Sequence, residues 1–306
     1  MRFCILGCAL LWFGCRSEEV PRIDILALGH IYRWDDSNDR VDPRIAALRR
    51  DTFEQLWLLG DLLGRTDEKP ENYHYLDSLF ELTSPRTLWV EGNHDVNTGR
   101  VKAHPLRPAP FSAHRLDGLH VWRLNTNLFV WPGSKQPPQV CAMAAAQLDS
   151  IQLWTTRLLR DRPAHLVVLH HQVVLTDVNF DGQPLNKVWN YYRPDLWVSC
   201  DTHQPFSEAL LPLFEQLQAN GTQVTFVGGD IGQRTKTFDA VAPSGIRYLG
   251  TGINNSMNPE YPPAYVSNLN PDSILLLQYF PSSNKLSFNF VPLGQESAAY
   301  QAIWDK

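Results

Sequence analysis

Five short apolar segments of this chain each end in residues that bind metal ions or transfer protons. The segments cover residues 23–30, 55–61, 88–95, 165–171 and 224–230, and they end in His30, Asp61, Asn93-His94-Asp95, His170-His171 and Asp230. Short apolar runs that stop at a glycine-containing turn are typical of buried strands. Because functional sites of layered α/β sheets gather at the carboxyl ends of strands, five such endings predict one shared site.

The segment Leu88-Trp-Val-Glu-Gly-Asn-His-Asp95 shows the pattern most clearly. A strand-like run leads to Gly92, where the chain can turn, and three polar side chains follow in a row. A buried turn also uses Asn and Asp to satisfy its own backbone, so the motif by itself indicates only a turn. The four similar endings elsewhere in the chain favour a functional interpretation.

The stretches between these segments predict helices and further strands. Helical spacing or capping residues favour helices over 44–50, 73–82, 144–160 and 211–219. Additional strands are expected over 120–125 and 246–252, with a C-terminal hairpin over 273–280 and 285–291, whereas residues 100–115 are expected to form a proline- and cation-rich loop. Strands that alternate with helices predict a layered α/β fold.

The first 19 residues have the pattern of an export signal. Met1-Arg2 precedes an apolar run over residues 3–13, which is too short to span a bilayer and has the length of a signal core. Gly14-Cys15 at its end is similar to a bacterial lipoprotein cleavage site, in which Cys15 would carry the lipid. We therefore expect an exported protein, either periplasmic or anchored to the membrane through Cys15 alone.

Residues 20–306 are expected to form one domain with an aromatic-rich insertion at about 172–206. The chain has 306 residues, of which 43% are hydrophobic, and this is enough for a large core. Its formal charge of -5 is spread along the sequence, so no basic footprint for nucleic acid is present. Cys141 and Cys200 are the two cysteines of this domain, and they are either disulfide-bonded or buried as free thiols.

The residue types at the strand ends suit a particular metal chemistry. Neutral imidazole together with carboxylate and amide oxygens favours a divalent ion such as Mn, Fe or Zn. Two such ions hold a phosphate ester and activate water near neutral pH, and an aspartate between them can bridge both. A histidine that does not bind metal can then protonate the leaving oxygen.

The order of these motifs resembles the calcineurin-like metallophosphoesterase family. The family pattern runs D-x-H, G-D-x-x-D, G-N-H-[DE], a strand ending in His, and G-H-x-H. Here Gly92-Asn-His-Asp95 matches in full, Gly60-Asp61 matches the second motif, and Leu166-Val-Val-Leu-His-His171 is similar to the run before the fourth. The resemblance covers about residues 23–232 and implies a four-layer α/β/β/α sandwich with mixed sheets.

The resemblance also implies a role for each site residue. Asp61 would be the bridging metal ligand, and Asn93 would bind the second metal. His94 would be the general acid, with Asp95 orienting it. His170 would be the ligand of the fourth motif, and His171 is its alternative.

Four positions depart from the family pattern, among them Gly64, where the second motif commonly has an acid, and Asp230, which replaces a histidine of the last motif. Leu28 stands where the first motif has aspartate, and Gly232 stands where the last motif has histidine. By the family assignment, the first metal would retain His30 and Asp61 only, unless Asp35 or Asp36 folds back to help. The second metal would retain Asp61, Asn93, His170 and Asp230. The sequence therefore predicts one well-formed site and one weak site.

Three functions follow from this interpretation. The first is an exported hydrolase of phosphate esters, in which a metal-activated hydroxide attacks phosphorus and His94 protonates the leaving group. Its substrate would be a phosphorylated small molecule or a component of the cell envelope. The second is a catalytically degenerate binding or scaffold protein of the envelope, which Leu28 and Gly232 favour. The third is a hydrolase that uses a single metal.

Overall fold

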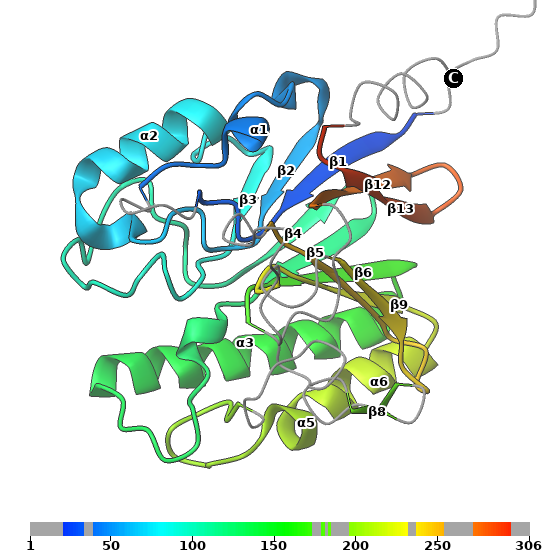
Figure 1. Ribbon diagram of the computed structural model, residues 1–306. Coiled ribbons are helices and arrows are strands. Elements are labelled where there is room, and N and C mark those ends of the chain that lie inside the picture. Colours follow the sequence, from blue (N-terminus) through cyan, green and yellow to red (C-terminus); the bar gives the residue numbers. More distant parts are fainter. Residues whose placement is uncertain are drawn as a thin grey trace, which may run out of the picture.

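Two β-sheets packed face to face form the centre of the computed structural model, and helices cover both outer faces (Figure 1). The structure describes residues 21–33, 39–172, 179–180, 183–184, 196–231, 237–253 and 272–294. This arrangement confirms the predicted four-layer α/β/β/α sandwich with mixed sheets.

The first sheet has the strand order β13-β12-β1-β2-β3. Its strands are β1 (Ile23–Leu28), β2 (Gln55–Leu58), β3 (Thr87–Trp89), β12 (Ser273–Phe280) and β13 (Lys285–Pro292). Strands β1, β2 and β3 run parallel, and β12 pairs antiparallel with β1. The predicted C-terminal hairpin is thus confirmed and extends the sheet beyond its first strand.

The second sheet has the order β10-β11-β9-β6-β5-β4. Its strands are β4 (Ser112–Leu116), β5 (Leu119–Arg123), β6 (His165–His170), β9 (Gln223–Gly228), β10 (Thr237–Val241) and β11 (Arg247–Thr251). The four inner strands are parallel, and both edge strands are antiparallel to their neighbours. The short strands β7 (Asn179–Phe180) and β8 (Gln183–Pro184) pair only with each other.

Helices α1 (Pro43–Ala46) and α2 (Pro70–Phe80) cover the first sheet. Helices α3 (Pro138–Asp161), α5 (Phe206–Ala209) and α6 (Leu211–Ala219) cover the second (Figure 1). Single turns of 3₁₀ helix occur at Arg50–Thr52, Thr66–Glu68 and Thr126–Leu128. Asp42 caps α1 as predicted, because its side chain accepts a hydrogen bond from the Arg44 amide.

Three buried clusters fill the spaces between the four layers. Alternate residues of β1 belong to different clusters: Ile25 and Ala27 face the second sheet, whereas Leu26 and Leu28 face the helices. Strands that are buried on both faces have nearly continuous apolar sequences, as the five segments do. Burial is almost complete in the cluster between the two sheets, where Trp57 is 0% exposed.

The structure corrects two predictions about the chain path. The end of the predicted loop over 100–115 forms β4, which pairs along β5 at the edge of the second sheet. Strand β10 was also missed, because Phe238 is its one buried residue and the other four are half-buried or exposed, as in a surface loop. Trp189, Tyr191 and Tyr192 of the predicted insertion lie outside the described residues, as do the predicted signal segment and Cys15.

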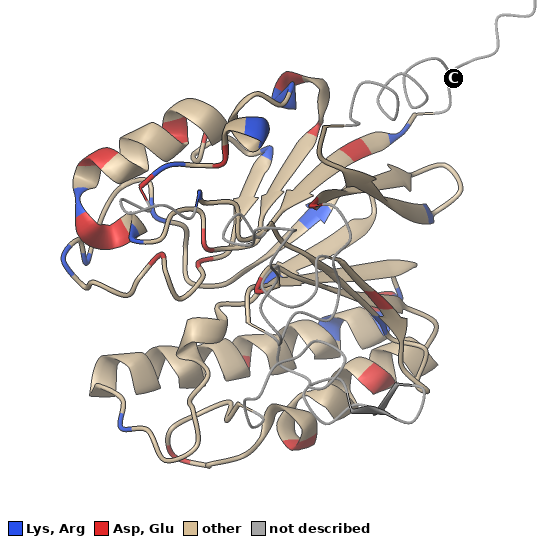
Figure 2. Cartoon of the chain, in the orientation of Figure 1, with Lys and Arg blue, Asp and Glu red and all other residues tan. Residues whose placement is uncertain are grey.

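Cys141 and Cys200 form a disulfide, which decides between the two alternatives left by the sequence. The bond joins the first turn of α3 to the segment that precedes α5, with the cysteines 59 positions apart. In the described part of the chain, no helix has the length and apolar character needed to cross a bilayer. Figure 2 shows Lys and Arg interspersed with Asp and Glu over the described elements.

Candidate metal centre

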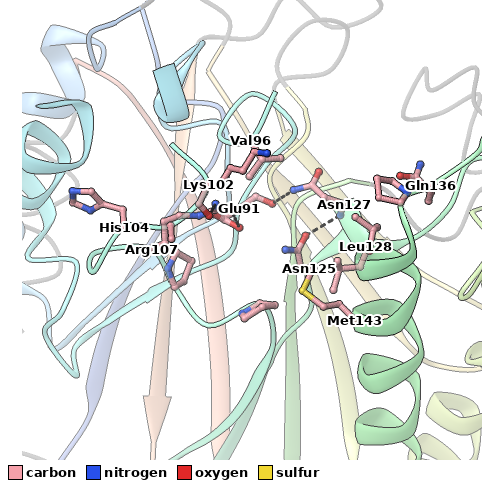
Figure 3. Close-up of a pocket in the computed structure, with 15 residues that line it drawn as sticks. Glu91, Val96, Lys102, His104, Arg107, Asn125, Asn127, Leu128, Gln136 and Met143 are labelled. Carbon is pink, nitrogen blue, oxygen red and sulfur yellow. Dashed lines mark hydrogen bonds and ion pairs between the residues drawn. The ribbon is translucent and has the colours of Figure 1, made fainter. Parts of the chain in front are cut away.

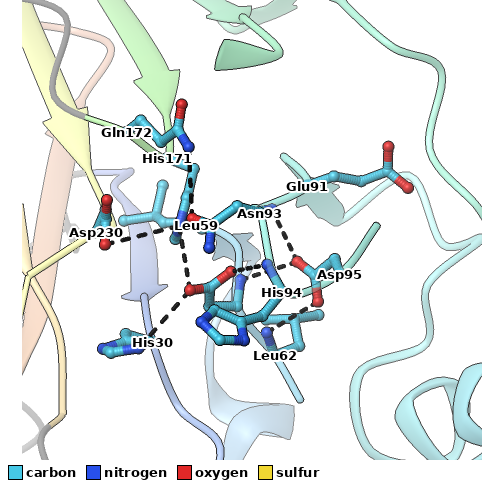
Figure 4. Close-up of polar contacts among 12 residues, drawn as sticks. His30, Leu59, Leu62, Glu91, Asn93, His94, Asp95, His171, Gln172 and Asp230 are labelled. Carbon is cyan, nitrogen blue, oxygen red and sulfur yellow. Dashed lines mark hydrogen bonds and ion pairs between the residues drawn. The ribbon is translucent and has the colours of Figure 1, made fainter. Parts of the chain in front are cut away.

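The carboxyl ends of β1, β2, β3, β6 and β9 bring their terminal residues to one edge of the sandwich (Figure 4). Three of these strands belong to the first sheet and two to the second. The predicted shared site therefore forms where the two sheets meet. It is built from turns, whose side chains converge because the strands before them are parallel within each sheet.

Asp61 is the central residue of this edge. Its side chain is 1% exposed, and its Oδ2 lies 3.3 Å from His171 Nε2 and 3.7 Å from His30 Nε2. Its Oδ1 accepts a hydrogen bond of 2.9 Å from the His94 backbone amide. Asp61 thus faces the residues that the sequence places around a bridging ligand.

The ring of His171 is completely buried and has a fixed orientation. Its Nδ1 donates to the Leu59 carbonyl over 2.7 Å, so Nε2 faces the carboxylates of Asp61 and, at 3.9 Å, Asp230. Nε2 is buried and has no hydrogen-bond partner in the described part of the chain. Burial disfavours charge on the ring, but the carboxylates of Asp61 and Asp230 outweigh burial and raise the pKa of His171 to about 10.

Asp61, His171 and Asp230 form a cluster with metal-binding geometry. One ligand atom from each lies within 4.8 Å of the others. Two carboxylates and an imidazole whose second nitrogen is held by a backbone carbonyl suit a divalent transition ion. The buried Nε2 of His171, which makes no hydrogen bond among the described residues, is the nitrogen that such an ion would bind. The residues present therefore fit a metal ion.

Two glycines allow the site to close this tightly. A Cβ atom at Gly92 would lie 2.2 Å from Asp61 Oδ1, and one at Gly60 would lie 2.5 Å from His171 Nδ1. Gly60 also has a φ of +85°, a conformation that side chains disfavour. The glycines of the second and third motifs are therefore needed for the approach of Asp61 to His171.

The structure replaces His170 by His171 as the histidine of the cluster. Successive strand residues point to opposite faces, so His170 turns toward the helices and packs edge-on against Phe226, with their ring centroids 5.7 Å apart. Its Nδ1 donates to the Gln172 carbonyl. Burial lowers the pKa of His170 to about 4, which keeps the ring neutral. Of the two histidines proposed for the fourth motif, the structure thus brings the alternative, His171, into the cluster.

His30 and Asn93 lie beside the cluster without belonging to it. His30 Nδ1 donates to the Ile231 carbonyl, which leaves Nε2 directed at Asp61. Burial lowers the pKa of His30, against the attraction of the Asp61 carboxylate. Asn93 Oδ1 accepts a long hydrogen bond of 3.4 Å from Gln172 Nε2. Both side chains lie at the same edge as the cluster (Figure 4).

His94 lies at the site, but Asp95 does not orient its ring. The Nδ1 of His94 lies 3.1 Å from the Gly64 carbonyl, which sets the ring orientation. Asp95 is fully buried and instead accepts hydrogen bonds from the amides of Asp61, Leu62 and Gly92 and from the Thr66 hydroxyl. Its role is to hold two turns together, because its oxygens are occupied by backbone groups.

Tyr32 is a site residue that sequence reasoning missed. Its ring packs against His30 and His94, with centroid distances of 5.0 and 5.5 Å. Burial, reinforced by the charge of Asp61, raises the pKa of its hydroxyl well above the usual range. The available signal was its position two residues after His30, immediately beyond a predicted strand.

Among the positions that depart from the family pattern, Leu28 lies within the described residues. Leu28 is 1% exposed and belongs to the helix-side core, so no carboxylate from this position reaches the cluster. Gly232, Asp35 and Asp36 lie outside the described residues. Asp201 and His203, which follow the aromatic-rich segment, are exposed, and the ring of His203 lies tilted against that of Trp197 with centroids 4.6 Å apart.

Comparisons with known proteins agree with this fold. The family model described as calcineurin-like phosphoesterase matches residues 25–205, which is more than half of the chain. GAP50, described as the anchor in the inner membrane complex of Plasmodium, has a TM-score of 0.52 at 10% identity, covering 90% of this chain and 85% of that chain. Vps29 of Chaetomium thermophilum has a TM-score of 0.33 at 11% identity, covering 88% and 97%.

A search of curated proteins gives no match. The similarity to GAP50 concerns the fold alone, because the identity is low. The family match, by contrast, includes the turns that carry Asp61, His94 and His171. The chain therefore belongs to the calcineurin-like phosphoesterase family.

Proposed function

We propose that the protein is an exported, metal-dependent hydrolase of phosphate esters. The observation that carries this proposal is the convergence of Asp61, His171 and Asp230, with the buried Nε2 of His171 lying 3.3 and 3.9 Å from oxygens of the two carboxylates. Two carboxylates and an imidazole nitrogen that converge in this way form a donor set for a divalent transition ion. A divalent ion between Asp61, His171 and Asp230 would satisfy all three groups at once.

These three residues would hold the ion, with His30 and Asn93 close enough in the fold to assist. Their donor atoms suit Mn, Fe or Zn. When bound, such an ion polarises a phosphoryl oxygen and lowers the pKa of a water molecule toward neutrality. Because Leu28 supplies no carboxylate, the described residues provide one well-formed site, and a second ion would have only His30 and Asp61 in the position that the family pattern assigns to it.

His94 is placed to transfer a proton at this edge. Its Nδ1 is directed at the Gly64 carbonyl, so Nε2 is the nitrogen available to a substrate. Only the imidazolium form carries a proton on both nitrogens, and this is the form that would protonate the leaving oxygen. Packing against Tyr32 restricts the tilt of the ring, which helps to fix the direction of transfer.

Export is the second part of the proposal. The Cys141–Cys200 disulfide supports it, because such bonds persist mainly in oxidising compartments. The apolar segment that precedes Cys15 supports it independently. The protein would then act in the periplasm or on a membrane to which Cys15 anchors it. Its substrate would be a phosphorylated small molecule or an envelope component.

One observation favours a second candidate function, that of a non-catalytic binding or scaffold protein. Leu28 occupies the position of a metal-binding aspartate and packs in the core. GAP50, which has the same fold, is described as an anchor rather than as an enzyme. In this alternative, His171 would be an imidazolium paired with Asp61 and Asp230 and would need no metal ion.

Metal analysis separates the two functions. The purified protein is stripped with chelator, incubated with Mn²⁺, Fe²⁺ or Zn²⁺, and analysed for bound metal by mass spectrometry. The enzyme requires at least one tightly bound ion, which His171→Gln should abolish. His120→Gln, which changes a half-buried histidine far from the cluster, is the matched control and should retain the ion.

An activity assay completes the test. The metal-loaded protein is assayed on chromogenic phosphate monoesters and diesters. His94→Gln should reduce turnover by about 10²–10⁴-fold while the bound metal remains, because proton transfer to the leaving group is lost. A protein that binds no metal ion and hydrolyses neither ester class would refute the hydrolase and support the scaffold.

A further inference from the structure

A pocket of about 660 Å³ opens beside the Glu91–Asp95 turn, outside the candidate metal centre (Figure 3). One wall is formed by the 96–110 loop, and the other by residues 125–128 and the beginning of α3. Glu91 contributes to the pocket, and its side chain points away from the cluster around His171 (Figure 4). The backbone of Glu91 and Gly92 therefore separates two sites. The volume lies within the range of small-molecule sites.

Asn125 provides a hydrogen-bond donor at this pocket. The residue is 6% exposed, and its Oδ1 accepts from the Asn127 amide. Its backbone is fixed by two hydrogen bonds to the side chain of Gln147. Its Nδ2 donates to no atom of the residues that the structure describes, and it faces the pocket (Figure 3). Such an amide requires an acceptor from a ligand or solvent.

The other polar groups of the pocket are mainly donors. Lys102 Nζ forms no ion pair within the described part of the chain. His104 Nδ1 accepts from the Leu106 amide, so its proton is on Nε2. Arg107 is held by Glu91 through two hydrogen bonds of 2.7 and 3.0 Å. This pairing neutralises the carboxylate and leaves Lys102 as the uncompensated charge.

The remaining lining is apolar. Val96, Leu128, Val140 and Met143 line the pocket together with three prolines, Pro108, Pro110 and Pro137. Met143 is 38% exposed and is one of three exposed large hydrophobic residues, with Leu153 and Val241, among the described residues. An apolar wall opposite a cation and an amide donor suits an amphiphilic ligand, because each part of such a ligand finds a complementary surface.

We propose that this pocket binds a small organic anion, with its acidic group near Lys102 and Asn125 and its apolar body against Leu128 and Met143. The site does not depend on the proposed hydrolysis. Asn127 also links it to the metal centre, because its Nδ2 donates to the carbonyls of Glu91 and Gly92 over 3.0 and 3.1 Å. A ligand in the pocket would therefore contact the residue that holds the turn before Asn93.

The test uses two fluorescent probes that differ in charge. The probe 1-anilinonaphthalene-8-sulfonate carries an anion on an apolar body, and N-phenyl-1-naphthylamine has a similar body without charge. Titration of the full-length protein should give one saturable site for the anionic probe. The neutral probe should bind about tenfold more weakly, because it makes no contact with the cation.

Two matched pairs of variants locate the binding site. Lys102→Glu should lower the affinity for the anionic probe about tenfold or more. Lys285→Glu, at an exposed position of the C-terminal hairpin, should change this affinity less than about twofold. Met143→Trp should fill the pocket and abolish binding. Leu153→Trp places the same side chain at another exposed position of α3 and should retain binding.

All four changes are at exposed positions, so the variants should fold, and circular dichroism checks this. Equal affinity of the two probes would overturn the proposed anion recognition. Binding that survives both Lys102→Glu and Met143→Trp would place the probe elsewhere and overturn the pocket assignment. The readout is fluorescence, so the result is independent of metal content and of esterase activity.

Discussion

Removal of the Cys141–Cys200 disulfide should lower the stability of the protein by an amount that follows from the length of the loop that the bond closes. The bond closes a loop of 59 positions in the unfolded chain. In the chain-entropy description, a loop of this length contributes about 4 kcal/mol to the free energy of unfolding. Both cysteines are only partly buried, so replacing them with serine leaves no large cavity. Cys141→Ser/Cys200→Ser should therefore lose most of this stabilisation.

Differential scanning calorimetry measures the loss. With roughly 2 °C for each kcal/mol in a chain of this size, the double variant should melt about 8 °C below the native protein. A reductant should lower the native melting temperature to the same value and leave that of the variant unchanged. Mass spectrometry after alkylation would verify that both thiols were released. A variant that melts within about 1 °C of the native protein would refute the loop-entropy argument.

Three further predictions concern the metal centre. Mn²⁺ at 100 times its dissociation constant should raise the free energy of unfolding, measured in urea, by about 2.7 kcal/mol. Asp230→Asn should reduce this gain at the same Mn²⁺ concentration. An equal gain in the variant would show that Asp230 is not a metal ligand. In the metal-free protein, the pKa of His171 is about 10, so metal binding must displace its proton, and the apparent affinity should rise up to about tenfold per pH unit between about pH 7 and 9. Calorimetry in buffers of different ionisation enthalpy measures the proton release, and its absence would contradict the role of His171. Leu28→Asp should lower the free energy of unfolding by about 3–5 kcal/mol, because residue 28 packs in the helix-side core. The variant should bind no additional metal ion. A second bound ion at unchanged stability would refute this prediction.

The layered fold could be predicted because its determinants are local. Each central strand is a short apolar run that ends at a turn, and α3 and α6 show helical spacing of their apolar residues. Strand β4 was missed because its residues alternate between half-buried and exposed, and its strand character depends on pairing with β5. Such edge strands are determined by their neighbours more than by their own sequence.

The site was predicted at the level of strand ends but not of side-chain direction. His170 and His171 are adjacent and chemically identical, and the choice between them depends on which face of β6 meets the first sheet. The role of Asp95 was missed for a similar reason, since its partners are backbone amides that no sequence motif displays. The place of Tyr32 between two histidines depends on the path of the turn after Gly29.

Asp95 lies beneath the candidate site, where its carboxylate joins the turn after β2 to the turn after β3. None of these hydrogen bonds involves the side chain of Asp61, His171 or Asp230, the three residues of the proposed metal cluster. The geometry of the edge is consequently independent of whatever ion it carries. A protein built in this way can exchange individual ligands during evolution while its backbone stays in place, so the architecture can outlast its original chemistry and acquire another.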